Sequence, residues 1–134
     1  MSSSLIQTAN QSSQNVADNS IISLGSVQRR FGCNCKLSGN AIEVSGQGYY
    51  VVSVSITATP TAAGNVTVTM FENGTPYTGA TATSSVTTVG NSTNLSLVTT
   101  VRKGCCDTGA SNLTFVLTEG AGVINNISAR VEKA

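Results

Sequence analysis

The chain of 134 residues contains no histidine and no tryptophan, and only 4% of its residues are aromatic and 10% charged. Without histidine, the usual general base for a serine or cysteine nucleophile is absent, and so is the commonest metal ligand. The six acidic residues are dispersed, so the paired carboxylates of a glycosidase are not indicated. We therefore expect no catalytic residues, no cofactor and no enzymatic activity.

The charge is also too small to indicate a polyanionic partner. The formal net charge is +1, with seven basic residues and few aromatic side chains on which bases could stack, so we expect no nucleic-acid partner. No long apolar segment is present, and we expect no membrane span. The first fifteen residues lack the basic region and apolar core of a secretion signal, so we expect synthesis and folding in a bacterial cytoplasm.

Hydroxyl side chains take the place of charge. The chain has 18 serines and 18 threonines, whereas a soluble domain ordinarily carries about 25% charged residues. A free monomer usually relies on a charged surface to stay dispersed. This composition therefore favours a protein that packs against copies of itself or against a larger body.

The segment Gly48–Pro60, GYYVVSVSITATP, alternates apolar and polar residues with a period of two. This period predicts a strand with one buried face, which includes Tyr50 and Val52, and one exposed face, which includes Tyr49 and Val51. Other short strands are expected between Gly- and Asn-rich turns. The expected strands are Ser20–Arg29, Asn40–Val44, Tyr49–Thr59, Asn65–Phe71, Thr81–Val89, Asn94–Val101, Asn112–Thr118 and Val123–Glu132. The pattern predicts an all-β sandwich of about eight to ten antiparallel strands.

The length fits one domain, which we expect at residues 20–134. Residues 1–19 are polar, with Leu5 and Ile6 as isolated apolar anchors. This segment is expected to be either an N-terminal arm that orders against a partner or a short first strand. Leu5 and Ile6 are accordingly candidate interface residues.

Short motifs resemble a known family. The sequence GQGYY at residues 46–50 resembles the opening of a central strand in tumour-necrosis-factor-like and complement-type globular heads. The hairpin Asn73-Gly74 is similar to that of their bacterial jelly-roll relatives, and the last strand ends as theirs does. The order RRFGCNC, GYYVV, TPTAAGNVTVT and a cysteine pair after VRKG resembles small proteins encoded with structural genes of phages of Gram-positive bacteria.

The resemblance implies a jelly roll that forms a homotrimer, because the related heads trimerise around apolar and aromatic strand faces. It also implies a virion location, as a capsid decoration (cement) protein whose partners are itself and the major capsid protein or another virion protein. Residues 1–19 would then grip the shell. The alternative is a receptor- or glycan-binding tip module of a tail fibre or surface filament.

The four cysteines form two clusters, Cys33-Asn34-Cys35 and Cys105-Cys106, each just past an expected strand and each preceded by a basic pair. Disulfides within or between chains are one interpretation, provided that the Cα atoms approach within about 7 Å. Free buried thiols are a second interpretation. A zinc site of Cys33, Cys35, Cys105 and Cys106 is a third, although adjacent cysteines are awkward ligands for one ion.

The remaining candidate features are two basic pairs and one aromatic pair. We interpret Arg29-Arg30 and Arg102-Lys103 as solvated or interface charge rather than as a phosphate site. Tyr49 and Val51, on the exposed face of their strand, are interpreted as subunit-interface residues rather than as a sugar-stacking platform.

Overall fold

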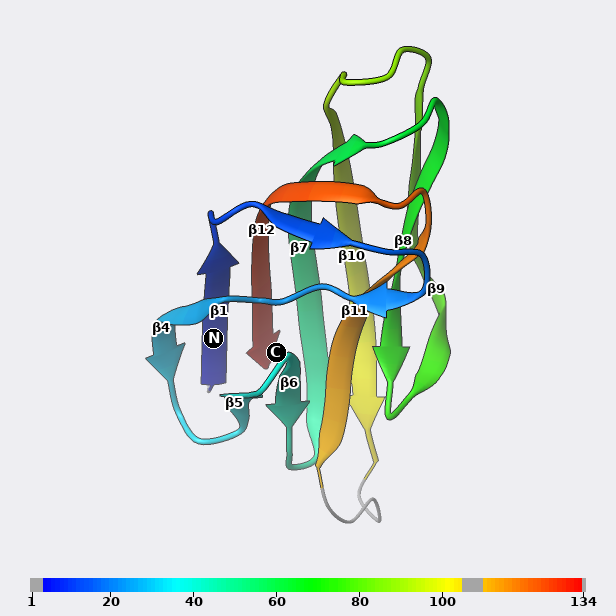
Figure 1. Ribbon diagram of the computed structural model, residues 1–134. Coiled ribbons are helices and arrows are strands. Elements are labelled where there is room, and N and C mark those ends of the chain that lie inside the picture. Colours follow the sequence, from blue (N-terminus) through cyan, green and yellow to red (C-terminus); the bar gives the residue numbers. More distant parts are fainter. Residues whose placement is uncertain (1–3, 105–109, 134) are drawn as a thin grey trace.

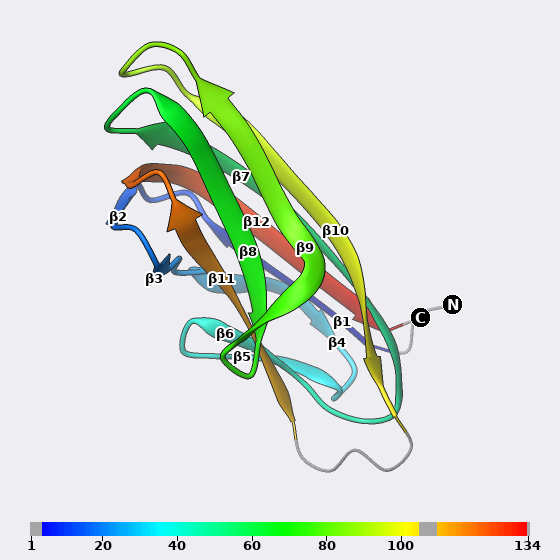
Figure 2. The same cartoon turned by 90° about the vertical axis from the view of Figure 1, so that its right-hand side faces the viewer.

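The computed structural model describes residues 4–104 and 110–133, and these residues form an antiparallel jelly-roll β-sandwich (Figure 1). Two sheets lie face to face, with β8, β9 and β11 in one layer and β7, β10 and β12 in the other (Figure 2). Sheet A has the order β10-β7-β12-β1-β4, with β2 paired to β12, and sheet B has the order β5-β6-β11-β8-β9, with β3 paired to β11. Within the described residues no helix could span a membrane.

The strands of sheet A are β1 (Ser4–Asn10), β2 (Gln14–Val16), β4 (Ser26–Phe31), β7 (Gly48–Pro60), β10 (Thr93–Lys103) and β12 (Gly122–Lys133). Those of sheet B are β3 (Ser20–Ile21), β5 (Cys35–Ser38), β6 (Ala41–Val44), β8 (Gly64–Glu72), β9 (Thr75–Val86) and β11 (Ser111–Glu119). The predicted all-β sandwich is confirmed.

The alternation in β7 places its side chains as predicted. The inward-facing residues Tyr50, Val52, Val54, Ile56 and Ala58 are at most 4% exposed. They pack against inward-facing residues of sheet B, among them Met70 and Phe115, in one continuous core. The apolar inner faces of the two sheets are thereby removed from water, and this burial is the main source of the stability of such a sandwich.

The first strand occupies an interior position of sheet A. The sequence predicted either an N-terminal arm or a first strand for residues 1–19. Residues 4–10 form a strand that pairs with β12 on one side and with β4 on the other. Ile6 is 0% exposed and belongs to the core, so Ile6 is not available to a partner and its assignment as an interface residue was wrong. Removing residues 1–19 would take this strand out of the sheet, so these residues do not serve as a dispensable arm.

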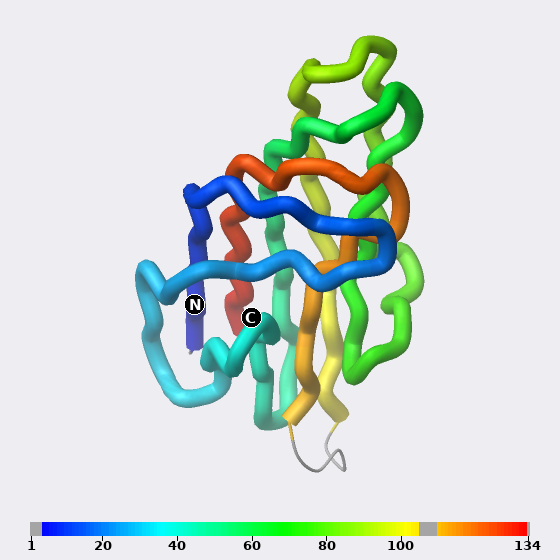
Figure 3. Tube along the Cα trace, viewed as in Figure 1, coloured from blue at the N-terminus to red at the C-terminus, as the bar shows by residue number. Residues whose placement is uncertain are grey.

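The expected strand Ser20–Arg29 is divided between the two sheets. Ser20 and Ile21 belong to sheet B, and the chain then crosses to sheet A, where β4 begins at Ser26 (Figure 3). The break falls at Gly25, whose φ is 78° and where an added Cβ would lie 2.3 Å from the carbonyl oxygen of Ala9. Only glycine fits this close approach, and it ends the extended conformation.

Thr8 in β1 points into the core without a hydrogen-bond partner. Its side chain is 0% exposed, and among the described residues its Oγ1 is the one buried side-chain polar atom that lacks a partner. We expect Thr8→Val to raise the free energy of unfolding by about 1 kcal/mol, because it removes a desolvated, unpaired hydroxyl at nearly constant volume. Urea denaturation measures the change. Thr100→Val on the exposed face of β10 is the control, and equal effects at both positions would contradict the explanation.

Candidate functional site

The outer face of sheet A is open to solvent and forms an ordered grid of side chains. One row across the strands runs Thr100, Val51, Glu132, Leu5 and Phe31. The next row runs Val98, Ser53, Arg130, Gln7 and Arg29, and the one above it runs Ser96, Ser55, Ser128, Ala9 and Ser26. The face is therefore apolar near one end and consists of small hydroxyl side chains in its middle.

The four central serines of this face have no partner within the described residues, whereas Ser26 at its edge accepts a hydrogen bond from Gln28 Nε2 at 3.2 Å. No hydrogen bond joins the hydroxyls of Ser53, Ser55, Ser96 and Ser128 to another described side chain or backbone group. Because these side chains are small, they leave a shallow hollow of about 300 Å³ that Gln7 and Arg130 also line. The face thus offers unpaired donors and acceptors together with room for a side chain from outside.

The outer face of sheet B satisfies its own hydroxyls instead. Thr67 Oγ1 lies 3.1 Å from Thr83 Oγ1, and Thr69 Oγ1 lies 3.3 Å from Thr81 Oγ1. Thr118 donates to the carbonyl oxygen of Thr67 at 3.2 Å. Threonines that bond across strands stabilise their own sheet and leave fewer polar groups for a partner. Sheet A has comparable bonds only near the end of β7, where Thr57 Oγ1 donates to Asn94 Oδ1 at 3.0 Å and Thr59 Oγ1 donates to Asn125 Oδ1 at 2.8 Å. The two faces therefore differ in their central parts.

Three of the four interface candidates lie on the outer face of sheet A. Tyr49 is 54% exposed and stands opposite Arg102 on β10, and Leu5 and Val51 are half-buried in the row described above. Val98, which is 69% exposed at the centre of β10, was not among the residues predicted for this face. Its position in an alternating strand could have revealed it, because Leu95, Leu97 and Val101 take the inward positions.

The two described cysteines have opposite environments. Cys33 is exposed and Cys35 is buried, and neither forms a disulfide within the part of the chain that the structure describes. Cys105 and Cys106 lie outside the described residues, so the disulfide and zinc interpretations stay predictions for them. Among residues 4–104 and 110–133, no three acidic or cysteine side chains are grouped to hold a metal ion.

A polar network closes the end of the sandwich around Tyr50. The Tyr50 hydroxyl lies 2.6 Å from the carbonyl oxygen of Ser45 and 2.8 Å from that of Gly46, and it donates to this pair. Asn34 Nδ2 donates to the same Ser45 oxygen at 2.7 Å, and Ser4 Oγ donates to Asn34 Oδ1 at 2.7 Å. The network therefore ties β1, the turn before β5, the β6–β7 turn and β7 to one another.

The fold is that of tumour-necrosis-factor-like and complement-head-like jelly rolls, and three solved structures illustrate it. The Eiger TNF of S. frugiperda aligns over 98% of this chain and 91% of its own, at 10% identity and a TM-score of 0.77. The globular domain of zebrafish complement 1qA protein aligns over 94% of both chains, at 5% identity and a TM-score of 0.70. The PRD1 vertex protein P5 aligns over 99% of this chain and 98% of its own, at 10% identity and a TM-score of 0.66.

These identities establish similarity of fold alone. No protein-family model matches the sequence. No curated protein matches it either.

The Tyr50 network gives a direct test of its contribution to stability. We expect Tyr50→Phe to lower the free energy of unfolding by about 1 kcal/mol, because the carbonyl groups of Ser45 and Gly46 lose this donor, although Ser45 keeps the bond from Asn34. The neighbouring Tyr49→Phe is a matched control on the exposed face and should change stability by less than about 0.5 kcal/mol. Urea denaturation of both variants measures the difference, and equal losses would show that the network contributes nothing.

Burial also predicts a fall in stability at alkaline pH. Burial raises the pKa of Cys35 from 9.0 to about 11, against the opposing effect of Arg30 and Lys133. Burial also raises the pKa of Tyr50, and the charge of the nearby Cys35 thiolate adds to this. Because the unfolded chain ionises Cys35 at the lower pH, this contribution is complete below about pH 9 and is lost as the pH approaches about 11.

Thermal unfolding between pH 8 and 11 measures this dependence. We expect Cys35→Ala to flatten the alkaline fall, and Cys33→Ala, which changes an exposed thiol, to keep the wild-type slope. An unchanged slope in Cys35→Ala would assign the fall to another group.

Proposed function

We propose that this protein is a non-enzymatic structural component of a bacteriophage particle, a homotrimeric decoration protein on the capsid surface. The observation that carries the proposal is the contrast between the two outer sheet faces. Sheet B pairs its own threonine hydroxyls, whereas the centre of the sheet A face presents unpaired serines and exposed apolar side chains. Burial of such a face in an assembly is favourable for a protein whose surface carries so few charges.

The likeness to PRD1 vertex protein P5 supports a place on a virus particle. That alignment spans almost the whole of both chains, so it involves the complete head and not one shared motif. It adds to the resemblance of the motifs to small proteins of phage structural gene clusters. The major capsid protein, or another protein of the particle surface, is the proposed partner.

The proposed trimer contact is the part of the outer face of sheet A that β10, β7, β12 and β1 form, and it leaves the edge strand β4 with Arg29 and Phe31 uncovered. Its central serines allow two flat faces to approach closely, and its hollow accepts a side chain from a neighbouring copy. Tyr49 and Val98 supply the exposed apolar groups that such a contact buries. Leu5 and Val51 continue the apolar row toward β1.

The alternative, a receptor- or glycan-binding tip, finds less support in the distal loops. Figure 1 places the β7–β8 and β9–β10 loops at the end away from both termini. Residues 61–63 and 87–92 of these loops include no aromatic and no charged side chain. Sugar-binding and receptor-binding tips normally present such groups, so decoration remains the favoured function.

A pair of arginine substitutions tests the trimer contact. We expect the wild-type protein to have three times the chain mass of 13.6 kDa in solution, as measured by native mass spectrometry. Ser55→Arg places a charge at the centre of the sheet A face and should yield monomers, because a buried unpaired charge opposes association. Thr83→Arg adds the same charge to the exposed face of sheet B and should leave the trimer intact.

Two results would overturn this proposal. A trimer that survives Ser55→Arg but not Thr83→Arg would move the contact to sheet B. A protein bound to purified particles at only a few copies, counted by quantitative mass spectrometry, would favour the tip, because a decoration protein is present at hundreds of copies.

A further inference from the structure

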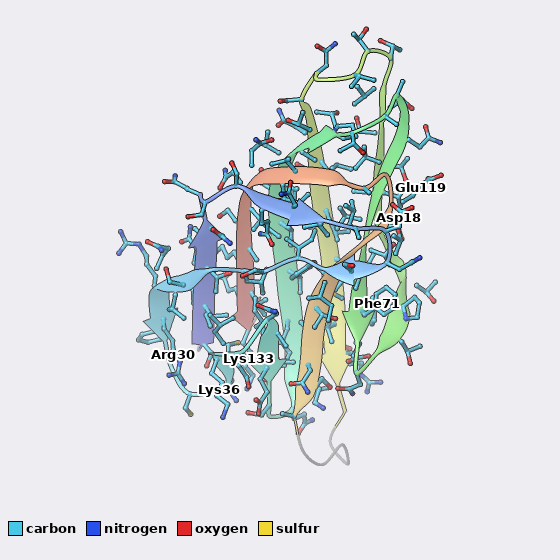
Figure 4. The ribbon with its side chains drawn as sticks, in the orientation of Figure 1. Asp18, Arg30, Lys36, Phe71, Glu119 and Lys133 are labelled. Atoms are coloured by element: carbon cyan, nitrogen blue, oxygen red, sulfur yellow. The ribbon has the colours of Figure 1, made fainter. Side chains whose placement is uncertain are left out.

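The basic residues gather at one end of the molecule, where three of the described acidic residues, Glu43, Glu72 and Glu132, also lie. All seven basic residues lie toward the end that carries both termini, on the later parts of β4, β10 and β12 and on β5. Asp18 and Glu119 lie toward the opposite end, whereas Arg30, Lys36 and Lys133 lie together near the termini (Figure 4). Among the described residues, the end near the termini therefore carries an excess of positive charge.

Arg30 on β4, Lys36 on β5 and Lys133 on β12 lie together (Figure 4), and we call them, with the neighbouring Arg29, the basic corner. Arg29 precedes Arg30 on the edge strand and stands in register with Gln7 on the outer face of sheet A. Arg30 Nε donates to the carbonyl oxygen of Cys35 at 2.9 Å, which fixes its guanidinium between β4 and β5 and leaves its other N–H groups free. Lys36 lies 3.8 Å from Glu43 in an exposed and therefore weak ion pair. Among the described residues no carboxylate lies within ion-pair distance of Arg29, Arg30 or Lys133.

The basic corner also has an exposed aromatic side chain. Phe31 follows Arg30 at the end of β4 and is 62% exposed, and all residues of this edge strand are exposed. Arginine and aromatic residues together are the side chains that contribute most to protein–protein contacts. A site for a polyphosphate alone would gain little from Phe31, so this combination favours a protein partner.

We propose that the basic corner docks onto a carboxylate-bearing surface of another protein, with Arg29 and Arg30 paired to carboxylates and Phe31 in apolar contact. A planar guanidinium matches a carboxylate through two parallel hydrogen bonds, which gives the contact orientation as well as attraction. The inference rests on the proposed function, since the acidic surface belongs to a protein of the particle. The end with Asp18 and Glu119 then faces away from the shell.

Binding to immobilised poly-L-glutamate tests the corner, with the full chain measured at about 20 and about 150 mM salt, where screening differs strongly. We expect Arg29→Gln/Arg30→Gln to weaken binding about tenfold or more, because exposed charge pairs of this kind govern the attraction. The matched control is Thr88→Glu/Asn91→Glu, which changes the net charge by the same amount in the distal loop and should bind within about twofold of wild type.

A second variant and a second probe make the result decisive. Arg29→Gln/Lys36→Gln leaves the Arg30–Cys35 hydrogen bond intact, so its loss of binding cannot come from a misfolded corner. Equal losses in corner and control variants would overturn the inference, since net charge alone would then explain binding. Duplex DNA of equal charge that binds as tightly as poly-L-glutamate would also overturn it, in favour of a general polyanion site.

The oligomeric state of the same samples separates this inference from the proposed function. A monomer with corner-dependent binding would contradict the trimer and leave the corner in place. A trimer whose binding ignores the corner substitutions would retain the proposed assembly and remove the docking surface.

Discussion

The antiparallel pairing of β12 with β7 on one side and β1 on the other is the constraint on which the rest of the structure depends. It joins the last described strand to the first, from Ser4 opposite Lys133 to Asn10 opposite Ile127, so the sheet closes only when nearly the whole chain is present. Contacts between such distant residues require a long loop to be ordered before they form. The same pairing brings both termini to one end, where the basic residues also gather.

The sequence was informative where a strand is long and alternates regularly. The segment Gly48–Pro60 was predicted in full because its inward residues are all apolar and its outward residues mostly hydroxyl-bearing. β1 was harder to predict because two of its inward positions are the buried Ser4 and Thr8, which interrupt the apolar period. β9 begins at Thr75, earlier than the predicted Thr81, and Pro76 lies inside this edge strand of sheet B, where its missing N–H costs little.

The candidate surfaces were less predictable because they are made by pairing across strands. Tyr49 and Val51 could be assigned to an exposed face from one strand alone, but their neighbours Thr100, Glu132 and Leu5 depend on the register of the sheet. The basic corner likewise collects residues from positions 29 to 133, which no local pattern relates. Whether a serine or threonine hydroxyl on these faces has a hydrogen-bond partner can be decided only when the cross-strand distances are known.

The proposed trimer contact and the proposed docking corner fit one physical scheme. Exposed ion pairs contribute little singly and are screened by salt, so one basic corner would hold its partner only loosely. A trimer formed through the outer face of sheet A carries three such corners on the same end, and each bound corner raises the effective concentration of the others at the surface. Association through a serine-lined face, on which Arg130 and Glu132 pair with each other, and attachment through a basic end are thus complementary. Association through the sheet A face depends little on salt, and it supplies the multivalency that attachment through the basic corner requires.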